Sequence, residues 1–149
     1  MRSFEVKPLI GVAPITLGMS REVSRQVMAR PFHTFQKVEG GSWVDAYFEN
    51  SFQVFFCRQN TVEFIELSSH AEASVMLMGV DVFSTDAESL LVALAQGSSL
   101  VSDDNGYSYV DSALSLGLWR PLLPDVDDDT GRLFSTVGIG IHGYYASVT

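Results

Sequence analysis

The apolar residues in the middle of the chain repeat with a period of two, the period of a β-strand with one buried face. Two such stretches, residues 52–56 and 62–67, flank a polar turn and predict a β-hairpin. The aromatic stretch before them predicts a strand at residues 43–48. By the same criterion we expect strands at residues 75–78, 80–83, 107–110, 113–119 and 134–145. The chain is therefore expected to be rich in sheet.

Two segments break this pattern with the signals of a helix. In the first, Ser20 is a suitable N-cap, because its hydroxyl can accept a hydrogen bond from a free amide of the first turn. Met19, Val23 and Val27 recur at every fourth position and would form one apolar stripe. We expect this helix to end before Pro31.

The second helical segment begins with the spacing of a capping box, in which Thr85 and Glu88 would cover each other's backbone amides. Gly97 is placed to end the helix in a left-handed conformation. One face of the helix would carry the apolar residues Ala87, Leu90, Leu91 and Leu94.

These elements fit a single domain over residues 1–149. We predict an α+β fold in which an antiparallel sheet carries both helices on one face. The order of elements repeats loosely, because a Gly-Val pair leads into a helix and then into strands at Gly11 and again at Gly79. A construction from two β-α-β-β halves therefore stays open.

Charge limits the partners that such a domain can have. The chain carries 18 Asp and Glu against nine Lys and Arg, a formal net charge of −9. Phosphate backbones and anionic membranes attract clustered basic residues, so the composition disfavours nucleic acid and membrane surfaces as partners. An acidic domain is suited to a basic protein partner, because opposite fields speed encounter. The alternative is that the acidity serves solubility alone.

The expected location is the cytoplasm. No apolar run approaches the ~18–20 residues of a membrane span. Glu5 and Lys7 stand where a signal peptide would be apolar. Cys57 is the single cysteine, so no intrachain disulfide can form.

The segment Gly138-Ile-Gly140-Ile-His-Gly143 matches the G-x-G-x-x-G pattern of dinucleotide sites. In such a site the glycines precede a helix whose N-terminus receives the pyrophosphate. Too few residues follow here for that helix, and the glycines alternate with apolar residues. We interpret them as small residues on one strand face and expect no nucleotide cofactor.

The spacing of Asp125, Asp127 and Asp129 resembles the opening of a calcium loop. That loop requires Gly at its sixth position and Glu at its twelfth, where this chain has Thr130 and Thr136. We therefore predict a solvated acidic loop that could receive a basic partner.

Cys57 could in principle pair with an imidazole from His33, His70 or His142. It ends an aromatic strand, where a free cysteine commonly behaves as a small hydrophobic residue. One Cys and three scattered His also lack zinc-ligand spacing. The sequence therefore predicts neither a catalytic residue nor a metal site.

The remaining polar candidates define a predicted partner-binding surface. Trp119 beside Arg120 could form a stacked or ion-paired corner near the acidic loop. The predicted surface consists of Asp125, Asp127, Asp128, Asp129, Glu63, Glu66, Asp103, Asp104, Trp119 and Arg120.

Two segments resemble a group of small, uncharacterised bacterial proteins. The first, residues 11–23, reads GVAPITLGMSREV; the second, residues 115–124, reads SLGLWRPLLP and is followed by GRLF and GYY. Some members of that group are immunity proteins of polymorphic or contact-dependent toxin systems, so the resemblance implies a role in neutralising a toxin. The helix start LGMS at residues 17–20 also resembles the helix-plus-strands unit of β-lactamase-inhibitor-like folds, whose sheet surface binds another protein.

The sequence as a whole predicts a non-catalytic, protein-binding or inhibitory domain whose partner could be a basic toxin domain. The alternative is a small-molecule or peptide-binding domain with aromatic residues around a pocket. An enzyme with an unfamiliar site has no support in the spacing of the residues, and the oligomeric state is open.

Overall fold

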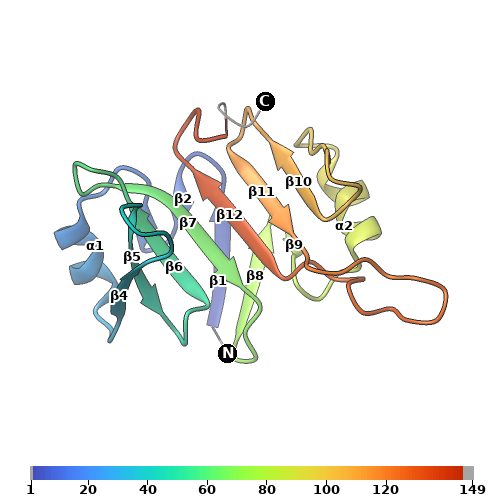
Figure 1. The fold of residues 1–149 in the computed structure, drawn as a ribbon, viewed down its shortest axis with the longest axis horizontal. Coiled ribbons are helices and arrows are strands. Elements are labelled where there is room, and N and C mark those ends of the chain that lie inside the picture. Colours follow the sequence, from blue (N-terminus) through green and yellow to red (C-terminus); the bar gives the residue numbers. More distant parts are fainter. Residues whose placement is uncertain (1, 146–149) are drawn as a thin grey trace.

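The computed structural model describes residues 2–145, which form two β-sheets and two helices. The larger sheet has seven strands in the order β10-β11-β12-β7-β6-β5-β4, all antiparallel (Figure 1). Its strands are β4 (His33–Gln36), β5 (Trp43–Tyr47), β6 (Phe52–Phe56), β7 (Val62–Ser68), β10 (Ser108–Asp111), β11 (Leu116–Trp119) and β12 (Thr136–Gly140).

The smaller sheet has five strands in the order β3-β2-β1-β8-β9, and its central pair β1 and β8 is parallel. These strands are β1 (Arg2–Lys7), β2 (Gly11–Val12), β3 (Ile15–Thr16), β8 (Ala73–Leu77) and β9 (Val80–Asp81). The sequence predicted neither this second sheet nor the strand β1. The strand that the sequence predicts at residues 134–145 is also too long. In the structure, the pairing of β12 with β7 and β11 ends at Gly140.

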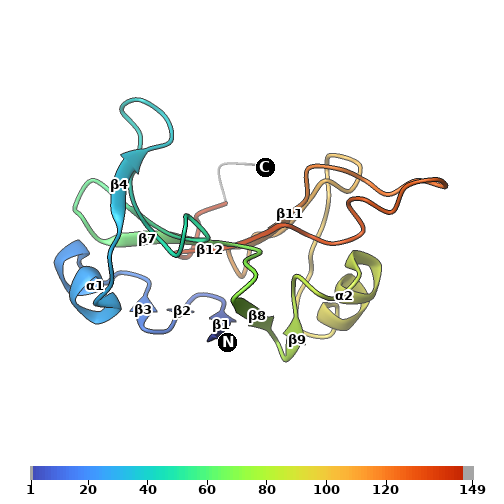
Figure 2. The same cartoon turned by 90° about the horizontal axis from the view of Figure 1, so that it is seen from below.

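Both helices, α1 (Arg21–Met28) and α2 (Ala87–Leu94), lie on one side of the seven-stranded sheet, as predicted. Figure 2 shows them at either end of the five-stranded sheet, which lies on that same side. One hydrophobic cluster fills the space between the layers and includes Val6, Phe52, Ile65, Leu90 and Val137. The α+β class is therefore confirmed. Neither helix is long and apolar enough to cross a membrane, within the residues that the structure describes.

The two halves of the chain contribute to both sheets. In the first half, β1, β2 and β3 of the smaller sheet lead through α1 to β4, β5, β6 and β7 of the larger one. In the second half, β8 and β9 lead through α2 to β10, β11 and β12. The halves meet at β1 and β8 in the smaller sheet and at β7 and β12 in the larger. The repeated unit is thus β-β-α-β-β-β, with β3 and β4 added in the first half.

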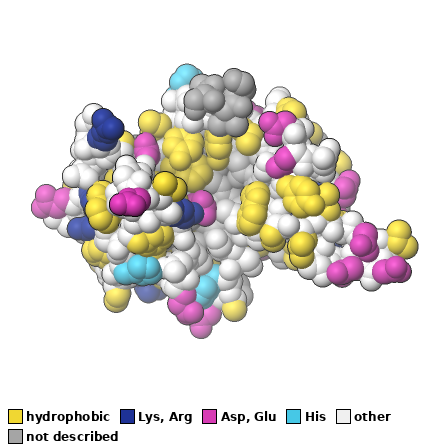
Figure 3. Space-filling view, in the orientation of Figure 1, with side chains coloured by type: hydrophobic (Ala, Val, Ile, Leu, Met, Phe, Trp, Pro, Cys, Tyr) yellow, Lys and Arg dark blue, Asp and Glu magenta, His cyan; other side chains and the backbone are white. Residues whose placement is uncertain are grey.

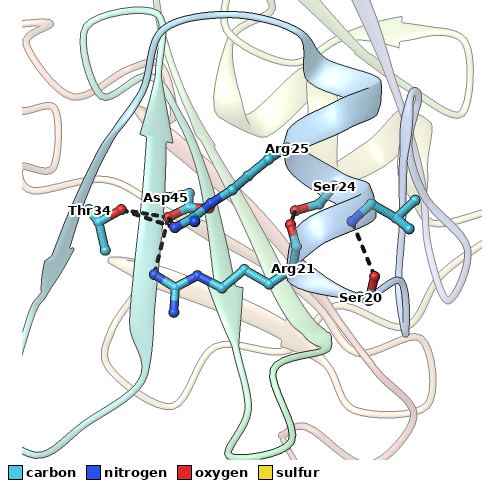
Figure 4. A network of polar contacts seen from close by, with 7 residues as sticks. Ser20, Arg21, Ser24, Arg25, Thr34 and Asp45 are labelled. Atoms are coloured by element: carbon cyan, nitrogen blue, oxygen red, sulfur yellow. Dashed lines mark hydrogen bonds and ion pairs between the residues drawn. The ribbon is translucent and has the colours of Figure 1, made fainter.

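Helix α1 starts as predicted, with the Ser20 hydroxyl accepting from the amide of Val23 at 3.1 Å. Its predicted apolar stripe is wrong, however, because Val23 and Val27 are exposed, whereas Ser24 and Met28 are buried. The physical reason is a carboxylate on β5, to which arginines of α1 bind, so that the face of the helix with these arginines points toward the sheet (Figure 4).

That carboxylate belongs to Asp45, which is fully buried. Arg25 on α1 donates to both of its oxygens, at 2.7 and 2.9 Å, and Thr34 on β4 donates at 2.8 Å. Arg21 adds a longer contact of 3.4 Å. Burial alone would raise the pKa of Asp45, but these hydrogen bonds and positive charges outweigh it and lower the pKa. The network fixes which face of α1 points inward.

Helix α2 buries Ala87, Leu90 and Leu94 as predicted. Its predicted capping box is wrong, because Asp86 is the N-cap and accepts from the amide of Glu88. Gly97 lies beyond the helix end and does not take a left-handed conformation.

Candidate functional site

The face of the seven-stranded sheet that points away from the helices carries a second, smaller aromatic cluster. We call it the outer face. Phe55 on β6 and Phe64 on β7 meet edge to face, with ring centroids 5.4 Å apart. Tyr144 stacks on Phe64 at 4.5 Å, and Tyr145 approaches the same ring at 6.1 Å with an interplanar angle of 82°. The chain after β12 therefore folds back over the sheet.

Glycines on β11 and β12 make room for these rings. A side chain at Gly138 would begin 2.3 Å from the ring of Phe64, and one at Gly140 would begin 2.5 Å from the ring of Tyr144. Gly138 and Gly140 are thus small residues on one strand face, as the alternation in the sequence predicted. Aromatic packing accounts for the Gly-x-Gly pair in this strand.

Beside this cluster the outer face has a hollow of about 280 Å³. Figure 3 shows hydrophobic side chains on both sides of a depression over the middle of the sheet. The floor of the hollow includes Gly117 and Gly138, and the side chains around it are those of Phe64, Glu66, Ser108, Trp119, Thr136 and Tyr145.

Two carboxylates of β7, Glu63 and Glu66, lie near the aromatic cluster of the outer face. Glu66 accepts a contact of 3.1 Å from the ammonium group of Lys37, and Glu63 accepts a hydrogen bond of 2.6 Å from the Ser42 hydroxyl. Burial and these two negative charges raise the pKa of Tyr144 to about 12. The phenol of Tyr144 is therefore protonated at neutral pH and carries no charge.

The predicted acidic loop, residues 125–129, projects from the α2 end of the molecule between β11 and β12 (Figures 1 and 2). Its own carboxylates order it, because Asp125 accepts from the amides of Asp127 and Asp128 at 2.9 and 3.0 Å. Asp128 accepts from the amide of Thr130 at 2.8 Å. Val126, at the tip, is fully exposed. The loop is a set of closed turns that presents acidic side chains to solvent.

The predicted pair Asp103 and Asp104 lies in the turn before β10. Asp104 accepts from the Ser108 hydroxyl at 2.6 Å and from the Ser102 hydroxyl at 2.9 Å. These bonds, those from Ser108 above all, lower the pKa of Asp104 to about 2. Asp104 is therefore ionised at neutral pH. It adjoins the hollow through its hydrogen bond from Ser108, which lines it.

Arg120 is buried rather than exposed beside Trp119, which corrects the predicted corner. Its side chain is buried, donating to the carbonyls of Gly106 at 2.9 Å and Gly131 at 3.0 Å. The guanidinium lies 5.3 Å from the ring of Phe134. Neighbouring residues of a strand point to opposite faces, so no corner forms with Trp119. Arg120 instead ties the base of the acidic loop to the turn before β10.

The structure thus divides the predicted surface into separate groups. Glu66 and Trp119 line the hollow, and Asp104 adjoins it. Residues 125–129 lie apart from the hollow, on the projecting loop. Sequence reasoning missed Phe64, Tyr145 and Lys37, which strand order and the returning chain bring to the outer face. The alternating glycines of β12 could have indicated the aromatic cluster, because a strand face without side chains leaves room for rings from other segments.

A larger hollow of about 690 Å³ lies between residues 36–43 and 56–63, with Trp43 and Cys57 in its wall. Two hydrogen bonds lie within its wall: Gln36 donates to the carbonyl of Gly41, and Ser42 donates to Glu63. The Cys57 sulfur lies 3.0 Å from the Thr61 hydroxyl, a hydrogen bond that lowers the pKa of the thiol.

Neither a thiol–imidazole pair nor a metal centre is formed in the part of the chain that the structure describes. None of the hydrogen bonds of residues 2–145 joins Cys57 to a histidine; His70, for example, accepts from the amide of Glu72 instead. Among the same residues, no three His, Cys, Asp or Glu side chains gather as metal ligands.

Comparisons with protein-family models, with curated proteins and with solved structures find no match for this chain. The function is therefore inferred from the geometry of the outer face and from the distribution of charge over the molecule.

Proposed function

We propose that this protein is a non-catalytic, inhibitory binding domain that covers a basic protein partner, as an immunity protein covers a toxin domain. The observation that supports the proposal is the separation of charge along the chain. Residues 1–58 contain seven Lys or Arg and five Asp or Glu, a net charge of +2. Residues 59–149 contain two Lys or Arg and thirteen Asp or Glu, a net charge of −11.

The two basic residues of the acidic part are already included in its net charge of −11. Arg120 is buried, and Arg132 pairs with Asp129 at 3.5 Å. In Figure 3 the basic side chains of the outer face all lie on the side of α1, β4 and β5, and the acidic loop lies at the opposite end. A field arranged in this way attracts a basic protein and also orients it during encounter.

The order within the acidic loop supports recognition of another protein. Its turns are already closed by Asp125 and Asp128, and Arg120 holds its base. A loop that is ordered before binding loses less conformational entropy when a partner docks. The free carboxylate of Asp127 and the exposed Val126 are then presented together, within the residues described.

The test uses the purified product of the gene next to the one that encodes this chain, mixed with the protein and followed by stopped-flow. We expect a complex whose association rate falls at least about tenfold between low and physiological salt. Replacing Asp127 and Asp129 together by Asn should slow association several-fold more than replacing Glu5 and Glu22 together by Gln. Both pairs change the charge equally, but only the first lies on the loop.

Inhibition is measured in the same mixture, as loss of the partner's activity or as survival of cells that co-express both proteins. A complex that forms at the same rate at all salt concentrations would contradict the proposal. So would a partner that stays active when bound, or a neighbouring gene product that does not bind at all.

A further inference from the structure

We propose that the hollow on the outer face binds an arginine side chain of the partner. This inference rests on the proposed function, and it names the chemistry that the hollow recognises. It is carried by three aromatic rings and one carboxylate that line one depression.

The rings provide the surface for a cation. Phe64 is nearly buried, whereas Trp119, across the hollow, is 46% exposed, so its indole face is open to a ligand. Tyr145 adds a third ring, edge to face with Phe64. A guanidinium within about 6 Å of such ring faces is attracted by their negative quadrupoles. A side chain at Gly117 would begin 2.6 Å from the Tyr145 hydroxyl, so glycine at this position leaves room for the third ring.

Glu66 provides the negative charge, and the protein itself demonstrates this pairing. The ammonium group of Lys37 lies 3.1 Å from Oε1 of Glu66 and 4.9 Å from the ring centroid of Phe55. Carboxylate and aromatic ring therefore already hold one cation together on the outer face. Within residues 2–145 only Oε1 of Glu66 is bonded, which leaves Oε2 for a second cation.

The size and the polar groups of the hollow select an arginine. At about 280 Å³ it lies just under the range of about 300–1,000 Å³ that is usual for small-molecule sites, and it fits a single side chain better. The hydroxyl oxygens of Ser108 and Thr136 are further acceptors on its rim. A guanidinium has five donors in a plane, stacks on rings and is weakly hydrated, whereas a lysine ammonium is compact and strongly hydrated. The net charge of −11 in residues 59–149 favours either cation over a neutral group.

The experiment detects binding in the hollow by the fluorescence of Trp119. The chain has two tryptophans, so Trp43→Phe leaves Trp119 as the sole indole reporter. This variant is titrated with a nona-arginine peptide, with nona-lysine, and with nona-citrulline, the neutral counterpart of arginine. We expect a saturable change in Trp119 emission with nona-arginine, a weaker change with nona-lysine and none with nona-citrulline.

Variants then localise the binding. Glu66→Gln should raise the Kd for nona-arginine about tenfold, because a hydrogen bond to a charged group is lost. Glu88→Gln is the matched control: it makes the same charge change on α2, on the other side of the sheet, and should alter the Kd less than about twofold. Trp119→Leu, followed by anisotropy of a labelled peptide, should also weaken binding, and circular dichroism checks the fold of each variant.

The outcomes separate the two proposals. If nona-arginine binds in a salt-dependent way but Glu66→Gln behaves like Glu88→Gln and Trp119 does not respond, the hollow is not the site, while the acidic binding surface stands. If nona-citrulline binds as well as nona-arginine, the hollow recognises something other than a cation. If no cationic peptide binds at all, the inference about the hollow and the proposed attraction of a basic partner both fail.

Discussion

At the scale of single residues, Asp45 is a fully buried carboxylate that binds side chains of two other elements. A buried carboxylate is tolerated only when hydrogen bonds and opposite charges compensate its desolvation. Arg25, Arg21 and Thr34 do so from two different elements, α1 and β4. One side chain thereby joins the helix and the edge strand to β5.

Asp45→Asn should lower the free energy of unfolding by about 2–4 kcal/mol near neutral pH, because it leaves two arginines without their counter-charge. The pKa of Asp45 is lowered in the folded protein. Its contribution is therefore complete above the ordinary aspartate pKa of about 4, and it is lost as the pH falls through the folded-state pKa.

Urea unfolding at about pH 7 and about pH 2 measures this difference, which should shrink in acid. Glu88→Gln, at an exposed carboxylate, is the control and should change stability by less than about 0.5 kcal/mol. A wild type and an Asp45→Asn variant of equal stability at neutral pH would show that the ion network does not hold α1.

Arg120 is a second residue whose role follows from burial. Arg120→Met should cost about 2–3 kcal/mol, because the carbonyls of Gly106 and Gly131 lose a charged donor. Arg132→Met makes the same charge change at an exposed ion pair with Asp129 and should be nearly neutral. Amide hydrogen exchange should also become faster in residues 125–131 of the Arg120 variant alone. Unchanged exchange there would mean that the acidic loop is ordered without Arg120.

At the scale of elements, the choice of which face of α1 is buried can be tested directly. Met28→Ala should cost about 2–3 kcal/mol, because Met28 is buried in the core between the layers. Val27→Ala, one position earlier and exposed, should change stability by less than about 0.5 kcal/mol. Urea unfolding of the two variants compares them directly, and a reversed order of their effects would restore the stripe of Val23 and Val27 that the periodicity predicted.

Local patterns were sufficient for most elements. The strand at residues 52–56 is observed with the predicted bounds, and β7 exceeds its prediction by one residue. Strand β1 was not predictable in this way, because Arg2, Glu5 and Lys7 interrupt its apolar residues and it forms by pairing with the distant β8. The inward face of α1 likewise depends on Asp45, which lies 20 residues from Arg25 in the chain.

In the candidate site, too, local sequence patterns predicted single residues but not how the fold brings them together. Glu66 and Trp119 were identified as exposed charged and aromatic residues of strands. Their neighbourhood was not, because it depends on β12 lying between β7 and β11, which no local pattern specifies. Tyr145 reaches the hollow only because the chain turns back after Gly140.

At the scale of the whole molecule, the separation of charge makes the protein a dipole as well as an acid. The total of −9 conceals a slightly positive part of +2 and a strongly negative part of −11. In the proposed function, a basic partner would approach from the end that carries the acidic loop. The count of charges along the sequence contains this separation, but only the fold shows that the acidic loop lies at the end of the molecule opposite to α1.

The position of β12 in the middle of the larger sheet also sets the order of assembly during synthesis. Strand β7 has one permanent neighbour, β6, until Gly140 has left the ribosome and β12 can insert beside β11. Strand β1 waits similarly for β8. The nascent chain thus carries first an unpaired edge of β1 and then an unpaired edge of β7, and such edges are where chains associate wrongly. The smaller sheet can close once Asp81 has been made, whereas the larger sheet closes only after Gly140.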